Sequence, residues 1–241
     1  MKAVILAAGV GKRLWPVTQH RPKCLIEVGG RTLLARYLDA LAAVGIKRAT
    51  LVVGYKQDMI REAVARAAAG VEARYLTNEQ FQRGSITSLW LARSEFDDDV
   101  LIMDADVLFH RMILRRLVES PRPTALLLDE TVTQRTEECM AAVRGGRVVA
   151  LSKRMPAQYD LAGEGVGFLK VSRRDTGALV ESLEAHVGRG NLDMEYEDAL
   201  DGFFSAVPVG YERIGGLPWI EIDFPEDVAR AEREILPKLD A

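Results

Sequence analysis

Small and basic residues gather in one stretch near the start of the chain, and together they have the chemistry of a phosphate-binding loop. The stretch reads Leu6-Ala7-Ala8-Gly9-Val10-Gly11-Lys12-Arg13-Leu14-Trp15-Pro16-Val17-Thr18, and Pro22-Lys23 follow four residues later. Glycine and alanine let backbone N–H groups approach an anion closely, and Lys12, Arg13 and Lys23 carry charge that could neutralise a triphosphate. We interpret the stretch as a nucleotide loop; the alternative is a flexible turn whose basic side chains are solvated.

This loop differs from two common nucleotide-binding motifs. A dinucleotide fingerprint, G-x-G-x-x-G, that began at Gly9 would need glycine or alanine at position 14, and a Walker A motif would need glycine at 14 and lysine at 15. Leu14 and Trp15 occupy these positions. The missing third glycine disfavours an enzyme that uses NAD(P), so the loop has to bind phosphate in another way.

Three aspartates stand at the ends of strand-like segments. Asp104 and Asp106 follow an apolar run, and Asp223 ends the alternating segment 219–223. Carboxylates placed where a parallel sheet opens suit a hard cation such as Mg²⁺. We expect Asp106 and Asp223 to be its ligands. The alternatives are that the first two cap their loop and that Asp223 is the N-cap of a helix that begins near Pro225.

Strand-like and helix-like segments alternate through the first half of the chain. We predict strands over 3–7, 49–53, 72–76 and 100–103 and helices over 32–45, 57–69 and 85–95. This order is typical of a mostly parallel sheet with helices on both faces, which binds ligands at the carboxyl ends of its strands. The loops after Ala7 and Met103 lie at that edge.

Beyond Pro121 the pattern of segments changes. Strands are predicted over 124–128, 140–143, 147–152, 166–171 and 207–213, with helices over 173–187, 195–204 and 225–236. Short strands separated by turn residues indicate a mixed or antiparallel arrangement. We therefore expect one α/β domain over 1–241: a Rossmann-like nucleotide-binding half to about residue 120, then an elaborated second half from about 121.

Composition excludes several classes of protein. Lys and Arg number 32 against 35 Asp and Glu, a net charge of −3, so no general positive field attracts nucleic acid. Cys24 and Cys139 lack the spacing of a zinc or redox site and are interpreted as reduced. Apolar runs fall short of the roughly 18–20 residues that span a bilayer, and the N-terminus lacks an export pattern. We expect a cytoplasmic protein that binds no membrane; homo-oligomer formation stays open.

The nucleotide loop and the later motifs resemble those of the sugar-phosphate nucleotidyltransferases. Within that superfamily the bacterial choline-phosphate cytidylyltransferase branch is the most similar, on Met103-Asp104-Ala105-Asp106, Ser152-Lys153, Gly163-Glu164-Gly165-Val166-Gly167-Phe168 and Ile220-Glu221-Ile222-Asp223. The resemblance implies a Rossmann-like fold related to GT-A, with an acceptor-binding second half. It also implies Mg²⁺, CTP as the nucleotide, and a small phosphorylated or phosphonylated alcohol or amine as the acceptor.

The resemblance also implies roles for individual residues. Arg13 would grip the triphosphate, Lys23 would bridge the α-phosphate and the incoming phosphate, and Asp106 and Asp223 would bind magnesium. The residues expected to line the nucleotide are Leu6, Ala7, Ala8, Gly9, Val10, Gly11, Lys12, Asn78, Gly84, Ser85 and Asp104. The residues expected to bind the acceptor are Lys153, Glu164, Glu195, Tyr196 and Glu197. For Ser85 the alternative is an N-cap of the following helix.

The identity of the acceptor stays open. A quaternary ammonium would favour an aromatic cage, yet the acidic segment 193–198 offers one aromatic residue among several acids, so a primary amine suits it at least as well. The acids could also be a solvated helix start. Phosphocholine, phosphoethanolamine and aminoethylphosphonate are the expected types of acceptor; inositol or glycerol phosphate, or UTP or dTTP with a sugar 1-phosphate, are alternatives. A non-catalytic nucleotide sensor is the alternative from another class.

Overall fold

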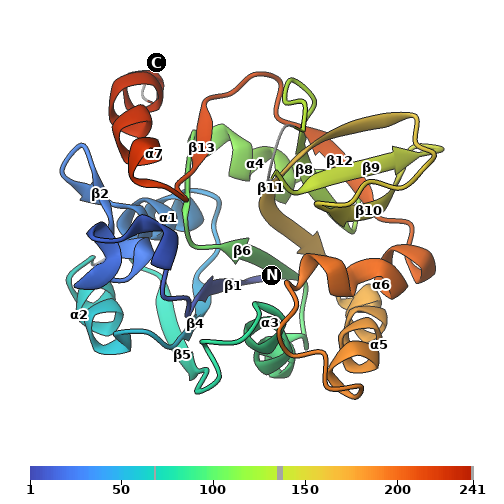
Figure 1. The fold of residues 1–241 in the computed structure, drawn as a ribbon, viewed down its shortest axis with the longest axis horizontal. Helices are drawn as coiled ribbons and strands as arrows, with labels where there is room; N and C mark the ends of the chain where they lie inside the picture. Colours follow the sequence, from blue (N-terminus) through green and yellow to red (C-terminus); the bar gives the residue numbers. More distant parts are fainter. Residues whose placement is uncertain (68, 135–137, 240–241) are drawn as a thin grey trace.

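The protein is built on one central sheet, shown by a computed structural model that describes residues 1–67, 69–134 and 138–239. In these residues the sheet has nine strands: seven lie in the order β10-β9-β11-β6-β1-β4-β5, β8 pairs with β11, and β12 pairs with β8 (Figure 1). The strands are β1 (Lys2–Ala7), β4 (Arg48–Val53), β5 (Glu72–Thr77), β6 (Val100–Asp104), β8 (Ala125–Asp129), β9 (Met140–Arg144), β10 (Arg147–Ser152), β11 (Leu161–Val171) and β12 (Gly210–Arg213). Both halves of the chain therefore contribute to the same sheet.

The first half forms the parallel part of the sheet, as its alternating pattern predicts. β1 pairs in parallel with β4 on one side and with β6 on the other, and β4 pairs in parallel with β5. Since the chain passes from β1 to β4 and β5 and then returns to the other side of β1, the strand order reverses between β1 and β6. Ligands bind beside such a switch point. The loops after Ala7 and Asp104 meet there.

The second half adds the antiparallel part. β11 runs antiparallel to β6, β8 and β9, and β10 forms a hairpin with β9. The register between β11 and β8 shifts between Gly165 and Leu169, where Gly167 has a φ of +76°. β11 begins at residue 161, five residues before the predicted strand. The sequence pattern did not reveal this added part, because glycines with low strand propensity occupy it. The predicted mixed sheet is confirmed.

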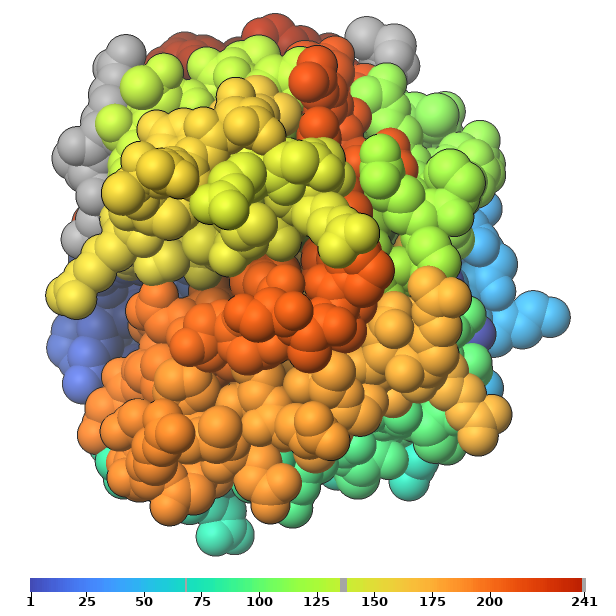
Figure 2. Space-filling model, turned by 90° about the vertical axis from the view of Figure 1, so that its right-hand side faces the viewer, coloured from blue at the N-terminus to red at the C-terminus, as the bar shows by residue number. Residues whose placement is uncertain are grey.

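Helices cover both faces of the sheet, as predicted. They are α1 (Leu33–Ala43), α2 (Gln57–Ala67), α3 (Ile86–Leu91), α4 (Arg111–Glu119), α5 (Thr176–Val187), α6 (Asp201–Ala206) and α7 (Pro225–Arg230). Apolar residues of α1 and α4 pack in the core cluster of one face, and those of α3, α5 and α6 pack in the cluster of the other. Figure 2 shows α5 and α6 in orange, packed against the yellow hairpin of β9 and β10. No helix in the described residues is long and apolar enough to cross a membrane.

Several predicted helices differ from the structure at their ends. The helix predicted over 85–95 is α-helical only to Leu91 and continues as a 3₁₀ turn, and the helix predicted over 225–236 is α-helical only to Arg230 and continues as a π-helical turn. The helix predicted over 57–69 ends at Ala67, and residue 68 lies outside the described residues. The helix predicted over 195–204 is wrong at its start, because residues 195 and 196 are not helical, Glu197–Leu200 form a 3₁₀ turn, and α6 begins at Asp201. The backbone N–H of Tyr196 donates to Ser85 instead of entering a helix.

Short strands outside the main sheet support the aspartate loops. β7 (Val107–Phe109) pairs antiparallel with β13 (Trp219–Glu221), and β2 (Glu27–Val28) pairs with β3 (Arg31–Thr32). The β7–β13 pair sets the segment that follows Asp106 beside the segment that precedes Asp223. The buried Tyr37 hydroxyl accepts a hydrogen bond from Val107 N at 3.1 Å and so fixes the turn between β6 and β7.

Candidate active site

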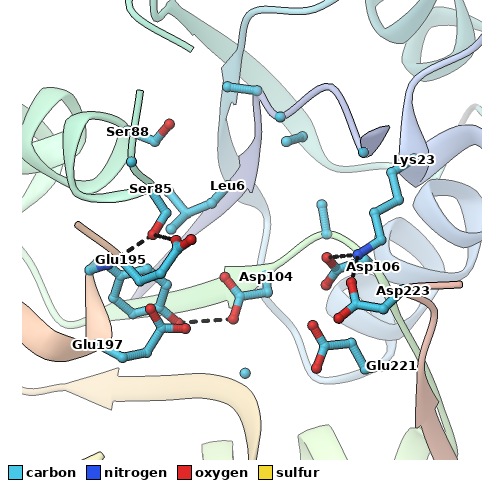
Figure 3. Close-up of a pocket in the computed structure, with 18 of the residues that line it drawn as sticks. Leu6, Lys23, Ser85, Ser88, Asp104, Asp106, Glu195, Glu197, Glu221 and Asp223 are labelled. Carbon is cyan, nitrogen blue, oxygen red and sulfur yellow. Dashed lines mark hydrogen bonds and ion pairs between the residues drawn. The ribbon is translucent and has the colours of Figure 1, made fainter. Parts of the chain in front are cut away.

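One deep pocket opens at the carboxyl ends of β1 and β6, where the fold brings the predicted site residues together. Its volume is about 550 Å³. Apart from Asn78 and Glu164, every site residue predicted from the sequence lines it: Leu6, Ala7, Ala8, Gly9, Val10, Gly11, Lys12, Arg13, Lys23, Gly84, Ser85, Asp104, Asp106, Lys153, Glu195, Tyr196, Glu197 and Asp223. Figure 3 shows that carboxylates from several elements surround the floor of this pocket.

The small-residue loop after β1 forms one wall. Gly11 has a φ of +65°, and its carbonyl accepts a hydrogen bond from Thr18 Oγ1 at 2.6 Å. Tyr55 donates its hydroxyl proton to the carbonyls of Thr18 and Gln19, and Leu14 is fully buried. These contacts hold the loop open toward the pocket, with Gly9 and Gly11 facing it. A Cβ built at Gly9 would meet no atom within 4 Å, so the space beside this residue is open.

A network of ion pairs lies at the far end of the pocket. Lys23 Nζ is 2.6 Å from Asp106 Oδ2 and 2.6 Å from Asp223 Oδ1, and Arg13 Nη2 is 2.8 Å from Asp223 Oδ2. Burial alone would lower the pKa of Lys23, but the charges of Asp106 and Asp223 outweigh it and hold this pKa above its ordinary value. Lys23 is therefore a fixed positive charge between two carboxylates.

Asp223 faces the pocket and does not cap the helix that follows it. The cap is made by Asp227, whose Oδ2 accepts hydrogen bonds from Asp223 N at 3.0 Å and Phe224 N at 2.8 Å. The carboxylate of Asp223 is engaged with Lys23 and Arg13 instead. Of the two alternatives for Asp223, the helix cap is wrong.

Asp106 and Asp223 form an acidic cluster with Glu221, which was not among the residues predicted for the site. One carboxylate oxygen from each of the three lies within 4.8 Å of the others. Asp106 Oδ1 is buried and has no hydrogen-bond partner among the described residues. Desolvation in the pocket and the charges of Asp106 and Asp223 raise the pKa of Glu221 to about 8. Three carboxylate donors with an unsatisfied buried oxygen fit a hard divalent cation such as Mg²⁺. The alternation of 219–223 contained the signal for Glu221, because it places that residue on the face of Asp223.

A second group of acids lines the opposite wall. The Tyr196 hydroxyl donates to Asp104 Oδ2 at 2.9 Å, and Tyr196 itself is buried. Burial and the charges of Glu195 and Asp198 raise the pKa of Glu197 to about 8. Glu197 Oε2 is buried and has no hydrogen-bond partner among the residues described. This wall therefore brings several carboxyl groups together in a buried setting.

Asn78 and Glu164 lie outside the pocket lining. The buried Asn78 donates to Thr87 Oγ1 at 2.9 Å and to Ser88 Oγ at 3.0 Å, so it is bonded to the first turn of α3. Burial and the charges of Glu138 and Asp129 raise the pKa of Glu164 to about 7. Contrary to the prediction, neither residue is part of the pocket lining.

Sequence reasoning missed several residues that line the pocket. They are Cys24, Phe81, Gln82, Arg83, Ser88, Ala105, Val107, Cys139, Leu151, Gly165, Val166, Gly167, Asp198 and Glu221. Phe81, Gln82 and Arg83 belong to the turn that precedes α3. Such a turn carries no periodic pattern, so only the tertiary structure reveals that these residues line the pocket.

Comparison with known proteins places this pocket in a wider context. The family model described as "MobA-like NTP transferase domain" matches residues 3–155. The CMP-5'-(3-aminopropyl)phosphonate synthase of Streptomyces rubellomurinus is 30% identical over 98% of this chain, and the match spans 39% of that protein. The CTP:phosphoglutamine cytidylyltransferase of Campylobacter jejuni is 22% identical over 95% of this chain and 98% of its own length.

A solved structure is similar in fold. The CTP:phosphocholine cytidylyltransferase of Streptococcus pneumoniae superposes with a TM-score of 0.77 over 96% of this chain and 97% of that one, at 22% identity. At this level of identity the likeness concerns the fold. It agrees with the mixed, mostly parallel sheet described above.

Proposed function

Because the chain belongs to the MobA-like NTP transferase family and is a nucleotidyltransferase, we propose that it joins CTP to a small phosphorylated or phosphonylated acceptor. The observation that carries this proposal is the placement of Lys23 and Arg13 between the small-residue loop and the Asp106–Asp223 pair, in one pocket. A nucleotide sensor has no need for cations and carboxylates at the far end of its phosphate site. Two relatives named for CMP or CTP chemistry support the choice of base.

In the proposed reaction, an oxygen of the acceptor's phosphate or phosphonate attacks the α-phosphorus of CTP. A new P–O bond forms, and the bond from the α-phosphorus to the bridging oxygen breaks as pyrophosphate leaves with the electron pair. The nucleophile is already an anion, so no general base is required. Two unit charges about 4 Å apart repel by about 4 kcal/mol at an effective dielectric constant of about 20. Cations have to offset that repulsion.

The chain's own side chains supply this compensation. Lys23 bridges the α-phosphate and the acceptor, and Arg13 binds the triphosphate, both as preorganised charges at the reacting centre. The backbone of Gly9 and Gly11 lines the phosphates, and Lys153 contributes charge from the acceptor side. Each of these groups stabilises the transition state by position and charge rather than by proton transfer.

Asp106 and Asp223, with Glu221 beside them, would hold Mg²⁺. Their oxygen donors and the buried, unpartnered Asp106 Oδ1 suit that ion. When bound, Mg²⁺ would neutralise phosphate oxygens and favour departure of pyrophosphate.

The acceptor that fits best carries a primary amine. Glu195, Glu197 and Asp198 line one wall, and an ammonium group beside them would favour the ionised form of Glu197, whose pKa is raised to about 8. The only aromatic ring in that segment is Tyr196, whose hydroxyl is engaged with Asp104, so the segment offers no cage for a quaternary ammonium. A relative named for an aminopropylphosphonate product supports an amine-bearing acceptor.

A pyrophosphate-release assay with Mg²⁺ tests the proposal. CTP, UTP, dTTP, ATP and GTP are crossed with phosphocholine, phosphoethanolamine, aminoethylphosphonate, glycerol phosphate, inositol phosphate and glucose 1-phosphate. Release with CTP and an amine-bearing acceptor is the expected result. Release with UTP or dTTP and glucose 1-phosphate would overturn the choice of base and acceptor. CTP binding with no release across the panel would favour the nucleotide sensor.

A further inference from the structure

The hydroxyl of Ser85 joins two segments that meet across the pocket. One segment is the turn 79–85 before α3, and the other is the acidic stretch 191–197. Ser85 Oγ donates to Glu195 Oε2 at 2.5 Å and accepts from Tyr196 N at 2.8 Å (Figure 3). Ser85 occupies the N-cap position of α3, as the alternative expected, but its side chain makes no cap hydrogen bond to the helix.

Backbone contacts bring these two segments close enough for that link. Gly84 N donates to Leu192 O at 2.9 Å, and Ile86 N donates to Met194 O at 3.3 Å. A Cβ at Gly84 would lie 2.0 Å from Met194 O, so any other residue would push the segments apart. The close approach sets Ser85 directly beside residues 195 and 196.

Tyr196 is held at both ends as a result. Its backbone N–H is fixed by Ser85, and its buried hydroxyl donates to Asp104 at the end of β6. Glu195 and Glu197 flank Tyr196 in the chain, so the positions of their carboxylates depend on how this residue is fixed. Glu195 has a further direct bond to Ser85.

We infer that Ser85 is a positioning residue for the acceptor, acting through Glu195 and Tyr196, rather than a residue that reads the nucleotide. A hydroxyl has one proton and two lone pairs. Glu195 takes the proton and Tyr196 N takes a lone pair, so Ser85 has no donor left for a base or a phosphate. The inference rests on the proposed function, because it assigns the wall of 195–197 to the acceptor.

Two readouts test this role. The first is the Michaelis constant for each substrate in the pyrophosphate-release assay. Ser85→Ala is expected to raise the KM for the acceptor about tenfold, the scale of one lost hydrogen bond to a charged group, and to change the KM for CTP less than twofold. Ser85→Thr keeps the hydroxyl and is expected to restore the acceptor KM. In a double-mutant cycle, Ser85→Ala should add little to Glu195→Gln, because both changes remove the same contact.

The matched control is Asp193→Asn, which weakens the exposed ion pair between Arg83 and Asp193 that joins the same two segments. Its acceptor KM should stay within twofold of wild type. An equal rise in Asp193→Asn and Ser85→Ala would mean that any link between the segments suffices, and would overturn the specific role of Ser85. A rise in the KM for CTP alone would mean that Ser85 contributes to binding the nucleotide and not the acceptor.

The second readout is a crystal structure of Ser85→Ala, which does not depend on turnover. The Glu195 carboxylate and the Tyr196 backbone are expected to leave their wild-type positions. If they stay in place, the inference is wrong even when the enzyme is active. If the wild-type enzyme uses no acceptor, the proposed function fails separately, and displacement in the crystal would still establish that Ser85 holds this segment.

Discussion

The ammonium group of Lys23 contacts two carboxylates that belong to different parts of the chain. Without Lys23, less positive charge would offset the repulsion between the triphosphate and the acceptor. We expect Lys23→Ala to lower kcat/KM by about a hundredfold or more, which corresponds to about 3 kcal/mol of transition-state stabilisation. Steady-state kinetics measures the loss, with circular dichroism to check the fold. Lys47→Ala removes an exposed lysine outside the pocket and serves as the control; an active, folded Lys23→Ala enzyme would contradict the mechanism.

The carboxylates on either side of Lys23 lead to a separate prediction about metal binding. Asp106→Asn or Asp223→Asn removes one charged oxygen donor from a cluster of three, and a hard cation depends on such donors. Each variant should lose the Mg²⁺-dependent reaction, and chelation by EDTA should silence the wild-type enzyme. Pyrophosphate release is measured against Mg²⁺ concentration, and Mn²⁺ binding by electron paramagnetic resonance reports on the site directly. Asp39→Asn, at an exposed aspartate, is the control. Wild-type metal response in both variants would place the metal elsewhere.

The burial of Glu164 makes the stability of the protein depend on pH. Its pKa is raised from 4.5 to about 7 by burial and by the charges of Glu138 and Asp129. The folded protein therefore holds this proton more tightly than the unfolded chain does, and the protein loses stability as the pH rises from about 4.5 to about 7. Glu164→Gln removes that loss and should stabilise the protein by at most about 3 kcal/mol at pH 8, with much less effect at pH 5.

Urea denaturation of wild type and Glu164→Gln at the two pH values measures this difference. Glu181→Gln, at an exposed glutamate on α5, shows the effect of replacing a glutamate as such. A stability difference that stays equal at pH 5 and pH 8 would count against the raised pKa.

At the level of elements, the irregularity in β11 lets one strand serve both the sheet and the pocket. Gly167 has a φ of +76°, and a Cβ there would lie 2.7 Å from Asp104 Oδ2, the atom that accepts from Tyr196. Gly167→Ala should therefore cost the backbone strain of a left-handed residue, about 1 kcal/mol, and in addition disturb Asp104. We expect a lower midpoint of urea denaturation and a higher acceptor KM.

Gly146 provides the matched comparison for Gly167. It has a φ of +75° in the β9–β10 turn, and nothing lies within 4 Å of its would-be Cβ. Gly146→Ala should show the backbone strain alone and leave the acceptor KM unchanged. Equal effects of the two substitutions on stability and KM would rule out a special role for the contact with Asp104.

The parallel elements could be predicted from the sequence because their signals are local. β1, β4 and β6 are short runs rich in apolar or β-branched residues, and α1 shows a helical stripe with Thr32 as its N-cap, whose side chain accepts from Ala35 N. The first part of β11 could not be predicted in this way. Gly163 and Gly165 have low strand propensity, yet glycine is required at 163, because a Cβ there would lie 2.5 Å from the backbone oxygen of Asp129. β7 and β2 are too short to show a period.

The same difference between local signals and tertiary contacts explains which site residues could be predicted. Residues on the loops after β1 and β6 could be predicted to meet, since the edge of a parallel sheet brings them together. Which face a side chain occupies depends on strand register and on neighbouring turns, and this is why Asn78 and Glu164 lie outside the pocket lining. The alternation of its own strand was enough to predict that Glu221 lies on the face of Asp223. That Asp106 lies beside it could not be predicted in this way, because Asp106 comes from a distant part of the chain.

At the scale of the whole molecule, the pocket belongs to neither half alone. Its nucleotide loop and Asp106 come from the first half, whereas Tyr196 and Asp223 come from the second. The antiparallel pairing of β11 with β6 makes the two halves one sheet, and Lys23 joins them through its ion pair with Asp223. Neither half can therefore lose its structure without removing hydrogen-bonded neighbours from the other. This supports a single domain over 1–241.

A single domain makes a prediction for unfolding. Differential scanning calorimetry should give one cooperative transition, with the calorimetric enthalpy equal to the van't Hoff enthalpy. Because CTP with Mg²⁺ would bind a pocket built from both halves, its addition should move the whole transition to higher temperature, by an amount that corresponds to about 2.7 kcal/mol at a ligand concentration of about a hundred times Kd. EDTA should remove most of this shift, and ATP at the same concentration is the control for base recognition. Two separate transitions, of which only one responds to CTP, would show that the halves unfold independently and that the pocket lies within one of them.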